Sequence, residues 1–112
     1  MLRILGVDDD PALLEDGKRS LNETGLFTVD TATSAGTAMQ MHTAAPYDII
    51  VSDYPVPEMN GIPLVKALRD QGDTTPFIVF TGRGSEEVMM QALGHGADGY
   101  VKKGGVQGEQ FV

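Results

Sequence analysis

The 112-residue chain contains no cysteine, few basic residues and no long hydrophobic run. Without cysteine, neither a disulfide nor a thiolate metal site can form, and a reducing compartment is natural for such a chain. No apolar run approaches the length of a membrane-spanning helix, and the opening Met1-Leu2-Arg3-Ile4-Leu5 is too short for a signal peptide. We therefore expect a cytoplasmic protein without a membrane segment.

The scarcity of basic residues also limits the possible partners. Eight Lys and Arg residues against sixteen Asp and Glu residues give a net charge of −8. Contacts with nucleic-acid phosphates need clustered Lys and Arg, so the charge argues against a nucleic-acid surface on this domain. The length allows one hydrophobic core and not two, so we predict a single domain spanning residues 1–112.

Apolar runs and turn signals divide the chain into alternating strands and helices. Ile49-Ile50-Val51 is a short β-branched run of the kind that is buried on both faces of a parallel sheet. Asp10 before Pro11, and Ser34, are typical N-caps of helices. The predicted strands cover residues 2–7, 27–32, 49–51, 76–81 and 99–101, and the predicted helices cover 11–24, 35–44, 61–71 and 86–95.

This alternation is typical of an α/β fold with a doubly wound, five-stranded parallel sheet. Right-handed crossovers place helices on both faces of such a sheet. The last segment, Val106 to Val112, is long enough for at most about two helical turns. We therefore expect the final helix of the domain to be truncated.

Polar residues follow the predicted strands at their carboxyl ends. They are Asp8, Asp9, Asp53, Thr81 and Lys103. Because parallel strands end at the same edge of a sheet, these five residues are expected to gather where open α/β sheets bind their ligands. Taken alone, Asp53 is also typical of a residue that caps a loop, since Pro55, Pro57, Asn60 and Gly61 follow it.

Carboxylates gathered at one edge repel one another unless a hard divalent cation such as Mg²⁺ lies between them. A carboxylate beside Mg²⁺ can attack phosphorus and become an acyl phosphate. Lys103 supplies a cation that neutralises phosphoryl charge, and Thr81 supplies a hydroxyl donor. These residues together predict phosphoryl transfer to Asp53.

At this point the chain resembles the response-regulator receiver domain of two-component signalling, from Leu2 to about Gly105. The residues that carry the likeness are Asp8-Asp9; Asp53 with Pro57, Met59 and Gly61; Thr81-Gly82; Gly96-Ala97-Asp98-Gly99-Tyr100; and Lys103. Each motif alone is weak, but five motifs in this order at the strand ends are specific. The resemblance implies the flavodoxin-like strand order 2-1-3-4-5.

The resemblance also implies a role for each matching residue. Asp53 is then the phosphoacceptor, and Asp8 and Asp9 form the acidic pair for Mg²⁺, with the main-chain carbonyl of Pro55 as a further ligand. The remaining roles go to Thr81 as the hydroxyl switch residue, Tyr100 as the aromatic switch residue and Lys103 as the phosphate-pairing lysine.

The implied partners are a sensor histidine kinase or a phosphotransfer protein. An output domain, or a second copy in a homodimer, is expected on the face of the fourth helix, fifth strand and fifth helix. The protein is then a switch with weak self-phosphorylation and self-dephosphorylation chemistry, not a free-standing enzyme.

Two departures from the family pattern concern the loops around the predicted site. Val56 stands where the family usually has Met, and Gly104 stands where it usually has Pro. The second change puts in doubt the geometry of the last loop and how firmly it holds Lys103. The Lys-Lys-Gly-Gly ending resembles receivers that are common in methanogenic archaea.

Four other interpretations remain open at this stage. A phosphatase or phosphotransferase of the haloacid dehalogenase type needs an acid two residues after its nucleophile, where this chain has Pro55. A flavodoxin-like FMN carrier needs a phosphate-binding first loop, which Asp8, Asp9 and Asp10 would repel. A degenerate receiver that is never phosphorylated, and a receiver fragment of a hybrid histidine kinase, complete the alternatives.

Several other residues receive ordinary structural interpretations. We expect His42 and His95 to be solvated surface residues on helices, and Met39 and Met89 to lie in the core. Met90 is a candidate interface residue.

Overall fold

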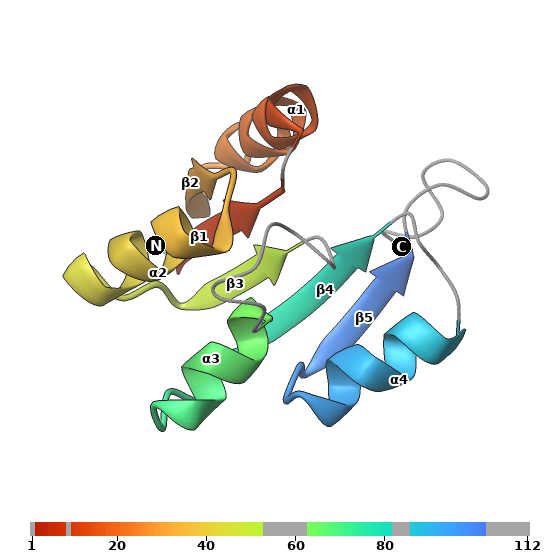
Figure 1. The fold of residues 1–112 in the computed structure, drawn as a ribbon. Helices are drawn as coiled ribbons and strands as arrows, with labels where there is room; N and C mark the ends of the chain where they lie inside the picture. Colours follow the sequence, from red (N-terminus) through yellow and green to blue (C-terminus); the bar gives the residue numbers. More distant parts are fainter. Residues whose placement is uncertain (1, 9, 53–62, 82–85, 103–112) are drawn as a thin grey trace.

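The computed structural model describes residues 2–8, 10–52, 63–81 and 86–102 (Figure 1). The strands are β1 (Leu2–Val7), β2 (Phe27–Ala32), β3 (Ile49–Ser52), β4 (Phe77–Thr81) and β5 (Gly99–Lys102). The helices are α1 (Pro11–Asn22), α2 (Ala35–Ala44), α3 (Leu64–Asp70) and α4 (Glu86–Gly94). The predicted incomplete helix from Val106 lies outside the described residues.

The five strands form one parallel sheet in the order β2-β1-β3-β4-β5. This is the predicted doubly wound α/β fold with the predicted strand order. In Figure 1, α2, α3 and α4 lie along one face of the sheet, and α1 lies on the other. All strand arrows point toward one edge, so that edge collects the residues that follow the strands.

The core lies between the sheet and its helices. Fully buried apolar side chains come from the central strands, as the β-branched and continuous apolar runs predict. Leu5 of β1, Ile50 of β3 and Val79 of β4 are at most 1% exposed. Val65 and Leu68 of α3 pack on them at helical spacing, and Ala92 does the same from α4. Leu93, the residue after Ala92 in α4, is 43% exposed.

Local signals set the ends of the helices. The Asp10 carboxylate accepts a hydrogen bond from the Ala12 amide at 3.0 Å, and Ser34 Oγ accepts one from the Thr37 amide at 3.2 Å, so both predicted N-caps are confirmed. Gly72 follows α3 with a φ of 80°, a conformation that favours glycine. The helix α3 begins three residues later than predicted, at Leu64, because Pro63 has an extended backbone with ψ of 144°.

Candidate functional site at the carboxyl edge of the sheet

The carboxyl ends of β1, β3 and β4 lie side by side. Val7, the last residue of β1, pairs with Ser52, the last residue of β3. Thr81, the last residue of β4, pairs with Lys102, the last residue of β5. The chain positions immediately after these strand ends are Asp8, Asp53 and Lys103. The sheet therefore brings the ends of all four segments predicted to carry the site to one edge (Figure 1).

Asp8 is the predicted site carboxylate that lies within the described residues. Its residue is only 5% exposed, its amide donates to the Ala32 carbonyl at 3.1 Å, and its Oδ1 accepts from the Asp10 amide at 2.9 Å. The strand and the following turn thus fix this carboxyl group at the end of β1. A buried, oriented carboxylate of this kind is a hard oxygen donor that suits Mg²⁺.

The other predicted site groups are only partly described. Asp9, Asp53, Pro55 and Lys103 lie outside the described residues, as does the side chain of Thr81. Within the described ranges, no group of three His, Asp or Glu side chains could hold a metal ion. The metal set Asp8, Asp9, Asp53 and Pro55 therefore stays a prediction.

Tyr100 lies in the middle of β5, where it pairs with Val79 of β4. Its side chain is partly buried and packs against the core cluster. It is thus two residues before the carboxyl end of its strand, on the strand that pairs with Thr81. Its role as an aromatic switch stays a prediction.

A model of the response regulator receiver domain matches residues 4–109, which is nearly the whole chain. The chain belongs to the response-regulator receiver family. Its function is that of a receiver in two-component signalling, where such domains accept a phosphoryl group. This decides against the phosphatase and the FMN carrier that the sequence left open.

Known relatives of this receiver domain agree in sequence and in fold. The response regulator MprA of Mycobacterium leprae is 36% identical over 102 residues, which cover 91% of this chain and 44% of the relative. The chemotaxis protein CheY4 of Vibrio cholerae is 30% identical with a TM-score of 0.84, covering 99% of this chain and 92% of that one. The receiver domain of the Francisella response regulator 1452 is 31% identical with a TM-score of 0.83, covering 92% and 84%.

The receiver domain spans less than half the length of the curated relatives that it matches. No helix among the described residues is long and apolar enough to cross a membrane.

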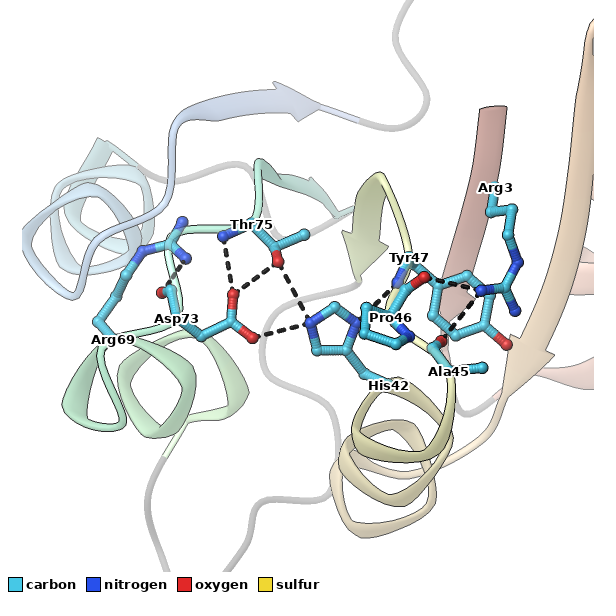
Figure 2. Close-up of polar contacts among 8 residues, drawn as sticks. All are labelled: Arg3, His42, Ala45, Pro46, Tyr47, Arg69, Asp73 and Thr75. Atoms are coloured by element: carbon cyan, nitrogen blue, oxygen red, sulfur yellow. Dashed lines mark hydrogen bonds and ion pairs between the residues drawn. The ribbon is translucent and has the colours of Figure 1, made fainter. Parts of the chain in front are cut away.

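At the opposite, amino-terminal edge the receiver domain holds a polar network that the sequence did not reveal (Figure 2). The prediction that His42 is a solvated surface residue is wrong, because His42 is only 4% exposed. It lies on the buried face of α2 with Ala35, Ala38 and Met39. That spacing of i, i+3, i+4 and i+7 was the available signal. His95 lies one residue past the end of α4 and is partly exposed.

His42 joins three segments of the receiver domain. Its Nδ1 accepts a hydrogen bond from the Tyr47 amide at 3.1 Å, and its Nε2 lies 2.8 Å from Asp73 Oδ2. The Thr75 hydroxyl donates to Asp73 Oδ1 at 2.6 Å. That hydroxyl bond is the main cause that lowers the pKa of Asp73 below its usual range, and the Thr75 amide and His42 also lower it, against the effect of burial.

Tyr47 continues this network toward β2 and β1. Its hydroxyl donates to Asp30 Oδ2 at 2.6 Å, and the Arg3 guanidinium lies 4.4 Å from the centre of its ring. Burial, followed by the hydrogen bond and the charge of Asp30, raises the pKa of Tyr47 to about 12, and the Arg3 charge opposes this rise. Arg3 also donates to the Ala45 and Pro46 carbonyls at the end of α2. This edge is therefore a structural anchor, distant from the candidate site.

Proposed function

We propose that Asp53 is the phosphoacceptor of this receiver domain and that it takes a phosphoryl group from a phosphohistidine of a sensor kinase or a phosphotransfer protein. A carboxylate oxygen of Asp53 attacks phosphorus, the phosphorus–nitrogen bond breaks, and the imidazole leaves with the bonding electron pair. The product is an acyl phosphate on Asp53. The observation that supports this proposal is the pairing of Val7 with Ser52, the residues that immediately precede the buried Asp8 and Asp53 in the sequence.

The neighbouring residues would provide the charge balance. We assign Asp8, Asp9, Asp53 and the Pro55 carbonyl as the groups that hold Mg²⁺, which supplies charge neutralisation to the phosphoryl oxygens. Lys103 would pair with a phosphoryl oxygen, and the Thr81 hydroxyl would donate to another. The buried carboxylate of Asp8 and the acidic, oxygen-rich set of donors support this metal.

The switch would run from Thr81 to Tyr100 through neighbouring strands. Thr81 follows Phe80, which pairs with Val101, the neighbour of Tyr100. A change in the position of the Thr81 hydroxyl on phosphorylation would therefore be transmitted to β5, the adjacent strand. The protein acts as a reversible switch whose own chemistry is limited to gaining and losing this phosphoryl group.

The output face of the switch would include α4 and β5. Met90 and Leu93 of α4 are 65% and 43% exposed, so this helix presents two large apolar side chains to solvent. We assign this face, together with a fifth helix, to an attached output domain or a second receiver. The curated relatives are more than twice as long as their matched region, which supports an output domain. We place the reaction in the cytoplasm.

Incubation with Mg²⁺ and acetyl phosphate tests the proposal. We expect the intact mass to increase by one phosphoryl group, and Asp53→Asn or chelation of Mg²⁺ to abolish that increase. Asp48→Asn is the matched control, because Asp48 precedes the same strand at its opposite end and accepts from the Arg3 amide at 2.7 Å. Asp48→Asn should be labelled like the parent chain. Equal labelling of Asp53→Asn would refute the assignment.

A further inference from the structure

The imidazole of His42 is held by two hydrogen bonds of opposite direction. The Tyr47 amide can only donate, so Nδ1 of His42, at 3.1 Å, must accept through its lone pair. Nε2 therefore carries the ring proton and donates to Asp73 Oδ2 at 2.8 Å. The contacts fix one neutral tautomer of His42, in which both ring nitrogens have partners.

These contacts connect parts of the chain that are distant in sequence. His42 lies in the last turn of α2, Tyr47 precedes β3, and Asp73 and Thr75 lie between α3 and β4 (Figure 2). The Thr75 hydroxyl lies 3.2 Å from His42 Nε2 and secures the Asp73 carboxylate from its other side. One imidazole thus ties α2 and the start of β3 to the turn that leads from α3 into β4.

We propose that His42 is a proton-sensitive latch, which holds these segments together while its imidazole is neutral and releases the Tyr47 amide when the imidazole gains a proton. The added proton goes to Nδ1, where it faces the Tyr47 N–H. The two donors, Nδ1–H of His42 and N–H of Tyr47, then point at each other without an acceptor, in a side chain that is only 5% exposed. The only gain is a stronger bond to Asp73, which His42 already makes. Acid therefore opens the contact.

The groups that face the imidazole support this direction. Among the described residues, Asp73 is the ionisable group in direct contact from the α3 side, and Arg69 of α3 donates to the Asp73 carbonyl at 2.9 Å. On the other side the Tyr47 ring stacks on His42, with centroids 6.1 Å apart, and in turn contacts Arg3 of β1 and Asp30 of β2. The lowered pKa of Asp73 keeps that carboxylate charged where histidines titrate.

Amide hydrogen exchange measured by NMR tests the latch in the native chain. The variant His95→Gln leaves His42 as the single histidine of the sequence. Between about pH 7.5 and pH 5.5, we expect the protection factor of the Tyr47 amide to fall roughly tenfold, which is the loss of about one hydrogen bond. The Ile50 amide, which donates to the Pro76 carbonyl at 2.9 Å in the same segment, is the internal control and should keep its protection.

Two results would overturn the latch. One is a Tyr47 amide that stays equally protected while the His42 ring signals titrate. The other is an imidazole that carries its proton on Nδ1 near neutral pH, as read from its ¹⁵N shifts. The inference does not depend on Asp53, so its failure would leave the proposed phosphoacceptor untouched.

A substitution provides an independent measurement. Asn at position 42 can still accept from the Tyr47 amide through its side-chain carbonyl, but it cannot take up a proton. The ratio of unfolding constants between the two pH values should be roughly tenfold smaller in His42→Asn/His95→Gln than in His95→Gln. An unchanged ratio would argue against the latch.

Discussion

At the scale of single residues, Asp73 is a carboxylate whose stabilising effect depends on pH. Its pKa in the folded chain is lowered, first by the Thr75 hydroxyl. A carboxyl group with a lowered folded pKa stabilises the fold above its ordinary pKa of 3.8, and this contribution is lost as the pH falls through the folded value. The Asp73 carboxylate therefore stabilises the fold fully near neutral pH and not in strong acid.

Thr75→Val removes the main cause of this shift while keeping the shape of the side chain. We expect the free energy of unfolding near neutral pH to fall by about 1.5 kcal/mol, the value of a hydrogen bond to a charged group. The difference from the parent chain should narrow as the pH falls through the Asp73 range. Urea unfolding at several pH values measures this difference in the free energy of unfolding. Thr74→Val, at the exposed neighbouring position, is the control. A difference that is constant with pH would contradict the cause assigned to the Asp73 pKa.

Tyr47 predicts a second pH effect, at the alkaline end. Because its folded pKa is raised from 10.0 to about 12, its neutral form stabilises the fold below pH 10, and this contribution is lost as the pH rises toward 12. Absorbance titration should show a late ionisation step, and Tyr47→Phe should remove that step. The variant should also lose about 1 kcal/mol near neutral pH with the Asp30 hydrogen bond. Retention of the late step in Tyr47→Phe would assign it to another tyrosine.

The gathering of the strand ends at one edge was easier to predict from sequence than this network. Val7 and Ser52, which precede Asp8 and Asp53 in the sequence, end strands that local patterns identify, so the position of these two strand ends at one edge follows from the strand direction. The partners of His42 have no such local signal, because Asp73 is 31 residues away and Thr75 is 33 residues away. Its helical spacing indicated burial, but a polar ring becomes buried only where distant partners satisfy both nitrogens.

At the scale of elements, Arg69 of α3 clamps the turn that joins α4 to β5. Its guanidinium donates to the Gly96 carbonyl at 3.0 Å and to Asp98 Oδ2 at 3.0 Å. Asp98 Oδ2 also accepts from the Phe77 amide at 2.9 Å, so the same carboxylate fixes the start of β4. The clamp therefore fixes the amino-terminal ends of the two strands whose other ends carry Thr81 and Lys102.

Substitution of Gly96 tests how closely the elements pack around this clamp, and Gly17 in α1 serves as the comparison. Gly96 has a φ of 109°, and a Cβ there would lie 2.6 Å from Arg69 Cγ, whereas a Cβ at Gly17 in exposed α1 meets nothing within 4 Å. Gly96→Ala should lower the free energy of unfolding by roughly 2 kcal/mol. Gly17→Ala should raise it by about 0.5–1 kcal/mol, since it replaces glycine inside a helix. Urea midpoints measure both, and a neutral Gly96→Ala would show that the turn is not constrained.

The boundaries of the elements were predictable where a local signal sets them. Asp10, Ser34 and Gly72 end or begin their helices as their chemistry predicts. The start of α3 was predicted three residues early. Proline is compatible with the first turn of a helix, but Pro63 takes an extended conformation and the helix begins after it, at Leu64.

At the scale of the whole molecule, the fold was predictable because every level of the sequence agrees. Buried β-branched runs alternate with helices that each carry one apolar stripe. This pattern allows few arrangements other than a doubly wound parallel sheet. The order β2-β1-β3-β4-β5 came from the family resemblance, and the sheet has that order. Periodicity alone could not have chosen it, since strand order depends on contacts between distant segments.

The shape of the sheet also explains why one small domain can keep its anchor and its chemistry apart. The network of Arg3, His42 and Asp73 lies at the amino-terminal edge, and the strand ends that lead to the candidate site lie at the other edge (Figure 1, Figure 2).

The most direct test of the account is to locate the phosphoryl group itself. After treatment with Mg²⁺ and acetyl phosphate, borohydride reduction converts an aspartyl phosphate to homoserine, and peptide mass spectrometry then identifies the altered residue. We expect homoserine at position 53 in the peptide that contains the end of β3. Homoserine at Asp8, Asp9 or Asp48, or a phosphoryl group that survives reduction on a hydroxyl or imidazole side chain, would contradict it.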